Sequence, residues 1–147
     1  MRFTFDSNIL VRAVTSPGGP ALRVLDLVLD THTLVLSRFI LDEVERVLLY
    51  PRIQSRYQIT LEEATRFTDS LAAASHLVEP TIIEPVVRSD PDDDAVLYTA
   101  ADGRAEILCT RNSRHFSSVA VKTFCERHGI RVMTDLEILQ EFLGRAE

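Results

Sequence analysis

Apolar positions fall into short runs and helical spacings that alternate along the chain. Four short apolar runs predict strands, at residues 2–5, 33–36, 106–110 and 130–133. Apolar residues that recur every three or four positions predict helices over residues 9–14, 21–29, 38–50, 60–74, 95–103 and 119–128, with a last helix from 134. Strands that alternate with helices predict a parallel sheet with helices on both faces.

Polar residues and prolines at the ends of these runs set the predicted boundaries. Ser37 is the predicted N-cap of the helix over 38–50, and Pro51 ends that helix because the residue before a proline avoids the α region. Residues 60–63 and 134–137 have the pattern of capping boxes, so each predicts the start of a helix.

The remaining segments are read as connections. Residues 16–20 form a turn by composition, and residues 78–83 are either one irregular strand or a connector. No internal repeat or linker interrupts the pattern, so we expect a single domain over residues 1–147.

Composition narrows the class of protein. Of 147 residues, 46% are hydrophobic and 26% are charged, which is typical of a soluble globular protein. No apolar run approaches the length of a membrane helix, and residues 1–6 do not resemble a signal peptide, so a cytoplasmic protein is expected. Cys109 and Cys125 are expected to be buried apolar residues, because neither has metal-site or redox spacing.

The formal net charge of −6 argues against broad electrostatic attraction to nucleic acid. It does not exclude a nuclease, because a divalent cation can change the sign of an acidic pocket. Net charge alone therefore leaves the function open. The positions of the acidic residues along the chain are more informative.

Carboxylates lie near several predicted junctions between a strand and the helix that follows it. Asp6 ends the first strand, Glu43 lies early in the helix after the second, and Asp90, Asp92, Asp93 and Asp94 precede a third helix. If the strands are parallel, these junctions meet at one edge of the sheet, where Mg²⁺ or Mn²⁺ can compensate the gathered charge. The alternative for Asp6 alone is a helix cap.

Helical spacing selects among the acids of the third group. Val96, Leu97 and Ala100 stand three, four and seven residues after Asp93, so Asp93 lies on the buried stripe of its helix. We expect Asp93 to be the inward ligand, supported by Asp90 or Asp94. The alternative is that these acids only complement the helix dipole, at roughly 0.3–1 kcal/mol each.

Two other acidic motifs share part of this pattern. An EF-hand loop needs a glycine at its sixth position and a glutamate at its twelfth, where this chain has Ala95 and Ala101. A phosphoaspartate hydrolase of the haloacid dehalogenase type needs a second Asp where Asn8 stands. The calcium loop is rejected, and phosphotransfer through Asp6 remains a minor hypothesis.

The chain resembles the PIN domain family, in its toxin branch related to the VapC ribonucleases. The resemblance runs along essentially the whole chain and rests on short motifs in a fixed order: residues 5–8, 41–44, 49–51, 90–94 with Ala100, 108–112 and 129–132. It implies a three-layer α/β/α sandwich with a central, mainly parallel sheet of four to five strands. It also implies a Mg²⁺- or Mn²⁺-dependent ribonuclease that cuts RNA.

The resemblance also assigns roles to single residues. Asp6, Glu43 and Asp93 would be metal ligands, directly or through water. Asn8 would orient Asp6 or the metal waters, and Thr110 would do similar work from the third of the four predicted strands.

The loop after that strand departs from the family pattern. Many relatives have an acid where Asn112 stands, and others have an Asp where His115 stands. Asn112 offers a neutral oxygen, while His115 is either a phosphate or proton contact or a surface residue. Arg111 and Arg114 flank the predicted pocket, and Arg12 follows Asp6 on the first predicted helix. As a set, these arginines offer contacts to phosphate.

Two function classes follow. The leading hypothesis is a metal-dependent endoribonuclease, the toxin of a toxin–antitoxin pair, with a homodimer and a cognate antitoxin as expected partners. The alternative is a PIN-like module that has lost catalysis through Asn112 and only binds RNA or a protein.

Overall fold

The core of the molecule is a five-stranded parallel sheet. The computed structural model describes residues 1–82, 84–87 and 91–144. The strands have the order β3-β2-β1-β4-β5, and all four neighbouring pairs are parallel. Their bounds are β1 (Arg2–Phe5), β2 (Thr33–Ser37), β3 (His76–Val78), β4 (Ile107–Cys109) and β5 (Arg131–Met133).

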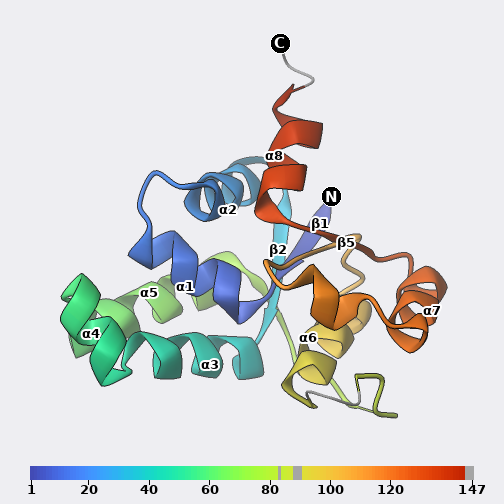
Figure 1. Ribbon diagram of the computed structural model, residues 1–147, viewed down its shortest axis with the longest axis horizontal. Coiled ribbons are helices and arrows are strands. Elements are labelled where there is room, and N and C mark those ends of the chain that lie inside the picture. The colour runs from blue at the N-terminus through green and yellow to red at the C-terminus, as the bar shows by residue number, and fades with distance from the viewer. Residues whose placement is uncertain (83, 88–90, 145–147) are drawn as a thin grey trace.

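Helices cover both faces of this sheet (Figure 1). The bounds are α1 (Ser7–Thr15), α2 (Pro20–Thr31), α3 (Arg38–Leu48), α4 (Pro51–Tyr57), α5 (Leu61–Ala74), α6 (Pro91–Asp102), the 3₁₀ helix η1 (Ser113–Phe116), α7 (Val119–His128) and α8 (Asp135–Phe142). Helices α1 to α5 lie on one side of the sheet, and α6 and α7 lie on the other. The predicted three-layer α/β/α sandwich with a parallel sheet is confirmed.

Apolar side chains on both faces of the strands form the core. Phe3, Phe5, Leu34, Leu36 and Ile107 have no more than 1% of their surface exposed. A strand buried on both faces reads as an almost continuous apolar run, which is why these strands were visible in the sequence. Both cysteines are buried and free, as expected.

The strand order creates a crevice beside β1. The connections from β1 to β2 and from β2 to β3 run over one face, whereas α6 and α7 lie on the other face. Neighbouring strands β1 and β4 therefore continue into segments on opposite faces. In open α/β sheets, ligands bind at such a switch point, outside the carboxyl ends of the strands.

The predicted helix caps are confirmed. The Ser37 hydroxyl accepts a hydrogen bond from the amide of Ile40 at 3.4 Å. The Thr60 hydroxyl accepts one from the amide of Glu63 at 3.0 Å. Thr134 and Glu137 form a complete capping box at the start of α8.

Several predicted boundaries need correction. Helix α3 ends at Leu48, and Pro51 begins α4, because a proline at the first helical position loses no hydrogen bond. Helix α6 begins at Pro91, so the acids that follow it lie inside the first helical turn. The segment over residues 78–83, predicted as one irregular strand or a connector, begins at the last residue of the short edge strand β3. Residue 83 lies outside the described residues.

In the described ranges, no helix is long and apolar enough to cross a membrane.

Candidate active site

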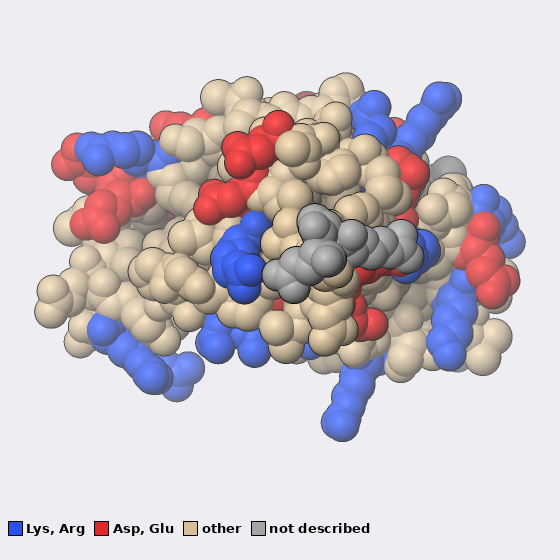
Figure 2. Space-filling view, turned by 90° about the horizontal axis from the view of Figure 1, so that it is seen from above, with Lys and Arg blue, Asp and Glu red and all other residues tan. Residues whose placement is uncertain are grey.

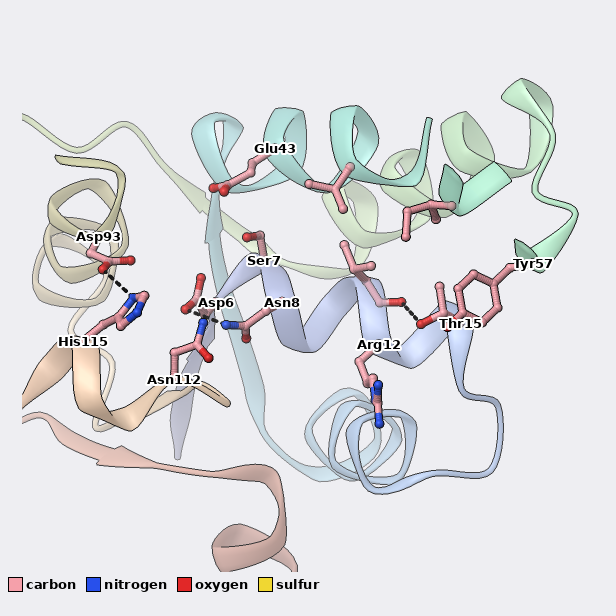
Figure 3. Close-up of a pocket in the computed structure, with 13 residues that line it drawn as sticks. Asp6, Ser7, Asn8, Arg12, Thr15, Glu43, Tyr57, Asp93, Asn112 and His115 are labelled. Atoms are coloured by element: carbon pink, nitrogen blue, oxygen red, sulfur yellow. Dashed lines mark hydrogen bonds and ion pairs between the residues drawn. The ribbon is translucent and has the colours of Figure 1, made fainter. Parts of the chain in front are cut away.

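One pocket brings together the three acids expected to bind a metal. It has a volume of about 380 Å³, and Asp6, Glu43 and Asp93 all line it. The pocket lies where α1, α3 and α6 begin and where the loop after β4 passes (Figure 3). The other lining residues are Ser7, Asn8, Val11, Arg12, Thr15, Val47, Ile53, Tyr57, Asn112 and His115.

Asp6 is positioned by the pairing of β1 with β4. Phe5 pairs with Cys109, and the Asp6 amide donates to the Cys109 carbonyl oxygen at 2.9 Å. Asp6 therefore lies opposite Thr110, whose hydroxyl donates to Asp6 Oδ2 at 2.9 Å. Asn8 Nδ2 donates to the same oxygen at 3.3 Å. These bonds fix the direction of a carboxylate that is 6% exposed.

The cap alternative for Asp6 is not supported by its geometry. Asp6 occupies the N-cap position of α1, but no side-chain capping bond to α1 is present among the described residues. The cap residue of a helix normally satisfies an amide of the first turn. The carboxylate instead accepts hydrogen bonds from the side chains of Asn8 and Thr110.

The loop after β4 is tied to the same group. Asn8 Oδ1 accepts a hydrogen bond from the Arg111 amide at 3.4 Å, and the Thr110 hydroxyl oxygen accepts one from the Asn112 amide at 3.1 Å. Asn8 and Thr110 therefore hold both Asp6 and the loop that carries Asn112. The prediction that Asn8 and Thr110 orient Asp6 is compatible with this geometry.

Glu43 enters the pocket from the second turn of α3. Burial raises the pKa of this half-buried carboxyl, and the negative charges of Asp6 and Asp92 raise it further. The positive charge of Arg46 and a hydrogen bond from the Ser7 side chain act in the opposite direction. Burial and two neighbouring carboxylates thus disfavour the charged form of Glu43, and a cation bound beside it would favour that form.

Asp93 and Asp94 occupy different environments although they are adjacent on α6. Asp93 is 7% exposed and lines the pocket, where its Oδ2 lies 3.2 Å from His115 Nδ1. Asp94 Oδ1 accepts hydrogen bonds from the amides of Val86 and Val87, each at 2.8 Å. Asp94 therefore anchors the segment before α6.

The remaining predicted residues are placed as follows. Asn112 lines the pocket, whereas Asp94, Arg111 and Arg114 are absent from the described lining. Asp90 lies outside the described residues. Arg111 reaches the site through its backbone amide.

Sequence reasoning predicted Arg12 as a phosphate contact but missed Thr15 and Tyr57 in the far arm of the pocket. Figure 3 shows Asp93 and His115 at one end, and Arg12, Thr15 and Tyr57 at the other. Tyr57 comes from α4, a helix that the sequence pattern did not predict. Ser7 was also missed as a partner of Glu43, because a serine at a helix start is read first as a capping residue.

The donor groups suit a hard divalent cation. In the part of the chain that the structure describes, no group of three or more His, Cys, Asp or Glu side chains forms a ready metal cluster. Mg²⁺ commonly keeps several waters and uses only one or two carboxylates, so a site of this kind need not be a closed cluster. The three carboxylates of the pocket and the raised pKa of Glu43 fit such an ion.

Comparison with known proteins agrees with this architecture. The crystal structure of VapBC2 from Rickettsia felis bound to a DNA fragment from their promoter contains a chain of similar fold, with a TM-score of 0.57. The two chains are 14% identical, and the match covers 91% of this chain and 98% of that one. The search of curated proteins found no match. Residues 2–114 match the PIN domain, and the chain therefore belongs to the PIN domain family.

Proposed function

We propose that this chain is a metal-dependent endoribonuclease and the toxin component of a toxin–antitoxin system. PIN domains are generally metal-dependent nucleases. The observation that carries the proposal is the convergence of Asp6, Glu43 and Asp93 from three separate elements on one pocket. That pocket lies at the carboxyl edge of the sheet, where ligands of open α/β folds bind.

The residues of the pocket have distinct tasks in this proposal. Asp6, Glu43 and Asp93 would hold Mg²⁺ or Mn²⁺, directly or through water. The ion, when bound, supplies Lewis-acid activation of water and neutralises charge on the leaving oxygen of the phosphodiester. Thr110 and Asn8 keep the Asp6 carboxylate in one orientation through the hydrogen bonds described above.

Substrate contacts are proposed along the length of the pocket. Arg12 lines the arm away from the acids and can contact a phosphate of the RNA backbone. Tyr57 is 36% exposed in the same arm and offers a face for stacking a base. Basic side chains are scattered over the face shown in Figure 2 and do not form one continuous patch there.

Protein partners are proposed from the resemblance to VapC ribonucleases. We expect a homodimer and a cognate antitoxin that binds beside the pocket. VapBC2, whose structure has a similar fold, was crystallised with promoter DNA. Val11, Val47 and Ile53 line the pocket and give its arm an apolar surface.

The function is tested by cleavage of RNA. Purified protein is incubated with RNA and Mn²⁺, with and without a chelator, beside Asp6→Asn, Asp93→Asn and the control Asp26→Asn, which changes an exposed acid on α2. We expect cleavage that needs the metal, that Asp6→Asn and Asp93→Asn abolish, and that the control retains. Cleavage that survives both pocket substitutions would show a contaminating nuclease and contradict the proposal.

The second candidate is a binding module without catalysis. Asn112 and His115 line the pocket. By the resemblance, many relatives have an acid at the first of these positions and others at the second, so this pocket would have fewer carboxylates than the family pattern. RNA retention without any metal-dependent cleavage in the same assay would favour this candidate.

A further inference from the structure

Most side chains of the pocket that could bind a metal offer an oxygen atom, whereas His115 offers a nitrogen atom. His115 Nδ1 is 3.2 Å from Asp93 Oδ2, and both residues line the pocket. The Asp93 side chain is 10% exposed and that of His115 is 49% exposed, so the pair spans from the wall of the pocket to its opening. Figure 3 shows the imidazole between Asp93 and the group formed by Asp6 and Asn112.

The local fold holds His115 in this place. It lies in η1, which begins directly after Asn112, and its amide donates to the Asn112 carbonyl oxygen at 2.9 Å. The next residue, Phe116, is 3% exposed and packs into the core. A buried neighbour and a short helix restrict the backbone, so the imidazole meets Asp93 in a defined position.

The distance between the two side chains matches that between neighbouring ligands of an octahedral ion. Ligand bonds of about 2.1 Å at right angles place two donor atoms about 3.0 Å apart. The observed 3.2 Å between Nδ1 and Oδ2 needs little adjustment to reach that separation. A divalent ion can therefore lie between the two groups and bind both.

We propose that His115 and Asp93 are adjacent ligands of one divalent ion, and that the nitrogen makes this pocket prefer Mn²⁺ to Mg²⁺. The inference rests on the proposed function. Carboxylate and water suit Mg²⁺ and Mn²⁺ alike, whereas imidazole suits transition metals and is a poor ligand for Mg²⁺. His115 thus replaces a missing acid with a group that selects the ion.

Pulsed electron paramagnetic resonance of the Mn²⁺-loaded protein tests the ligand directly. A bound imidazole gives a nitrogen hyperfine coupling, which we expect in the wild type and not in His115→Ala. The matched control is His76→Ala, which removes an exposed imidazole on β3 that does not line the described pocket. The coupling should be unchanged in this control.

Competition between the two ions tests the preference. Titration with Mg²⁺ against bound Mn²⁺ should show that His115→Ala lowers the affinity for Mn²⁺ by about 10–100-fold, the range found even for groups that only orient a ligand. The affinity for Mg²⁺ should fall less, so the Mn²⁺-over-Mg²⁺ affinity ratio should fall. His115→Asp should restore tight binding with the preference shifted toward Mg²⁺.

The outcomes separate this inference from the function itself. Mn²⁺ bound in the pocket without nitrogen coupling, or an affinity ratio unchanged in His115→Ala, overturns the role of His115 and leaves the ribonuclease proposal intact. Failure to bind any divalent ion overturns both.

Discussion

At the scale of single residues, the pocket depends on how each carboxylate is held. Thr110 and Asn8 both donate to Asp6 Oδ2. Burial, followed by the charges of Asp6 and Asp92, raises the pKa of Glu43, although Ser7 donates a hydrogen bond to this carboxyl. Asp6 is thus oriented by two donors, whereas the charged form of Glu43 is disfavoured by burial and by the neighbouring carboxylates.

Removal of the Thr110 hydroxyl tests how Asp6 is held. Thr110→Val keeps the shape of the side chain and removes a buried hydrogen bond to a carboxylate, which we expect to cost about 1.5–3 kcal/mol of unfolding free energy. Urea unfolding measures the loss. Thr31→Val is the control, because the Thr31 hydroxyl donates to the Leu27 carbonyl oxygen at the exposed end of α2. An equal loss of unfolding free energy in both variants would contradict the account.

The raised pKa of Glu43 predicts a pH-dependent stability. Burial and neighbouring charges raise this pKa in the folded protein, so the stability contributed by the protonated form is lost as the pH rises through it. At pH 7 in metal-free buffer, Glu43→Gln should therefore have a higher Tm than the wild type. The difference should disappear below about pH 4, where the wild-type carboxyl is protonated as well.

Two comparisons sharpen this measurement. Asp42→Asn, on the exposed side of the same helix, should not reproduce the gain in Tm. Added Mn²⁺ should raise the Tm of the wild type more than that of Glu43→Gln. A variant that is less stable than the wild type at pH 7 would show that Glu43 is not under electrostatic stress.

At the scale of elements, the first turn of α6 divides its acids between two tasks. Asp93 faces the pocket, whereas Asp94 satisfies the amides of Val86 and Val87. The sequence pattern placed Asp93 on the buried stripe correctly. It did not reveal the task of Asp94, because the amides that it binds belong to a segment without regular structure.

A pair of substitutions separates these tasks. Asp94→Ala leaves two amides without their acceptor and should lower the unfolding free energy by about 1–3 kcal/mol. Asp93→Asn should abolish RNA cleavage with little loss of stability, because it removes one of several repelling charges. Urea unfolding and the cleavage assay on both variants measure this, and the opposite assignment of effects would contradict it.

The end of α6 depends on a close approach to β2. A Cβ atom at Gly103 would lie 2.1 Å from Cγ1 of Val35, which is fully buried. Gly103→Ala should therefore lower the unfolding free energy by about 1–3 kcal/mol through overpacking. Val35→Ala in the same chain should recover part of the loss, and Gly144→Ala, which has open space, should change little.

At the scale of the whole molecule, the parallel sheet is what makes distant acids neighbours. Strands β1 and β4 are far apart in the sequence and adjacent in the sheet, and the crevice at their carboxyl ends receives Asp6 and the Thr110 loop. The alternation of strands and helices was enough to predict this edge as the place of the site. The pocket bears out the expected convergence of Asp6, Glu43 and Asp93, while their metal-binding roles remain a prediction.

Two elements of the fold, β3 and α4, have no clear pattern in the sequence and were not predicted. Strand β3 lies at the edge of the sheet, with His76 and Leu77 exposed, so it lacks the apolar pattern of a buried strand. Helix α4 begins at a proline that sequence reasoning took as the end of α3. The arm of the pocket with Tyr57 was missed for the same reason, since its wall depends on the packing of that helix.

The central claim is that Asp6, Glu43 and Asp93 hold one divalent cation. Locating Mn²⁺ in a crystal of this protein tests that claim most directly. Diffraction from crystals grown with Mn²⁺, collected at the manganese absorption edge, locates the ion without any assay of activity. The account predicts an anomalous peak in the pocket, within direct or water-mediated reach of all three carboxylates. A peak found only elsewhere on the protein, or an empty pocket at a saturating concentration of Mn²⁺, would contradict it.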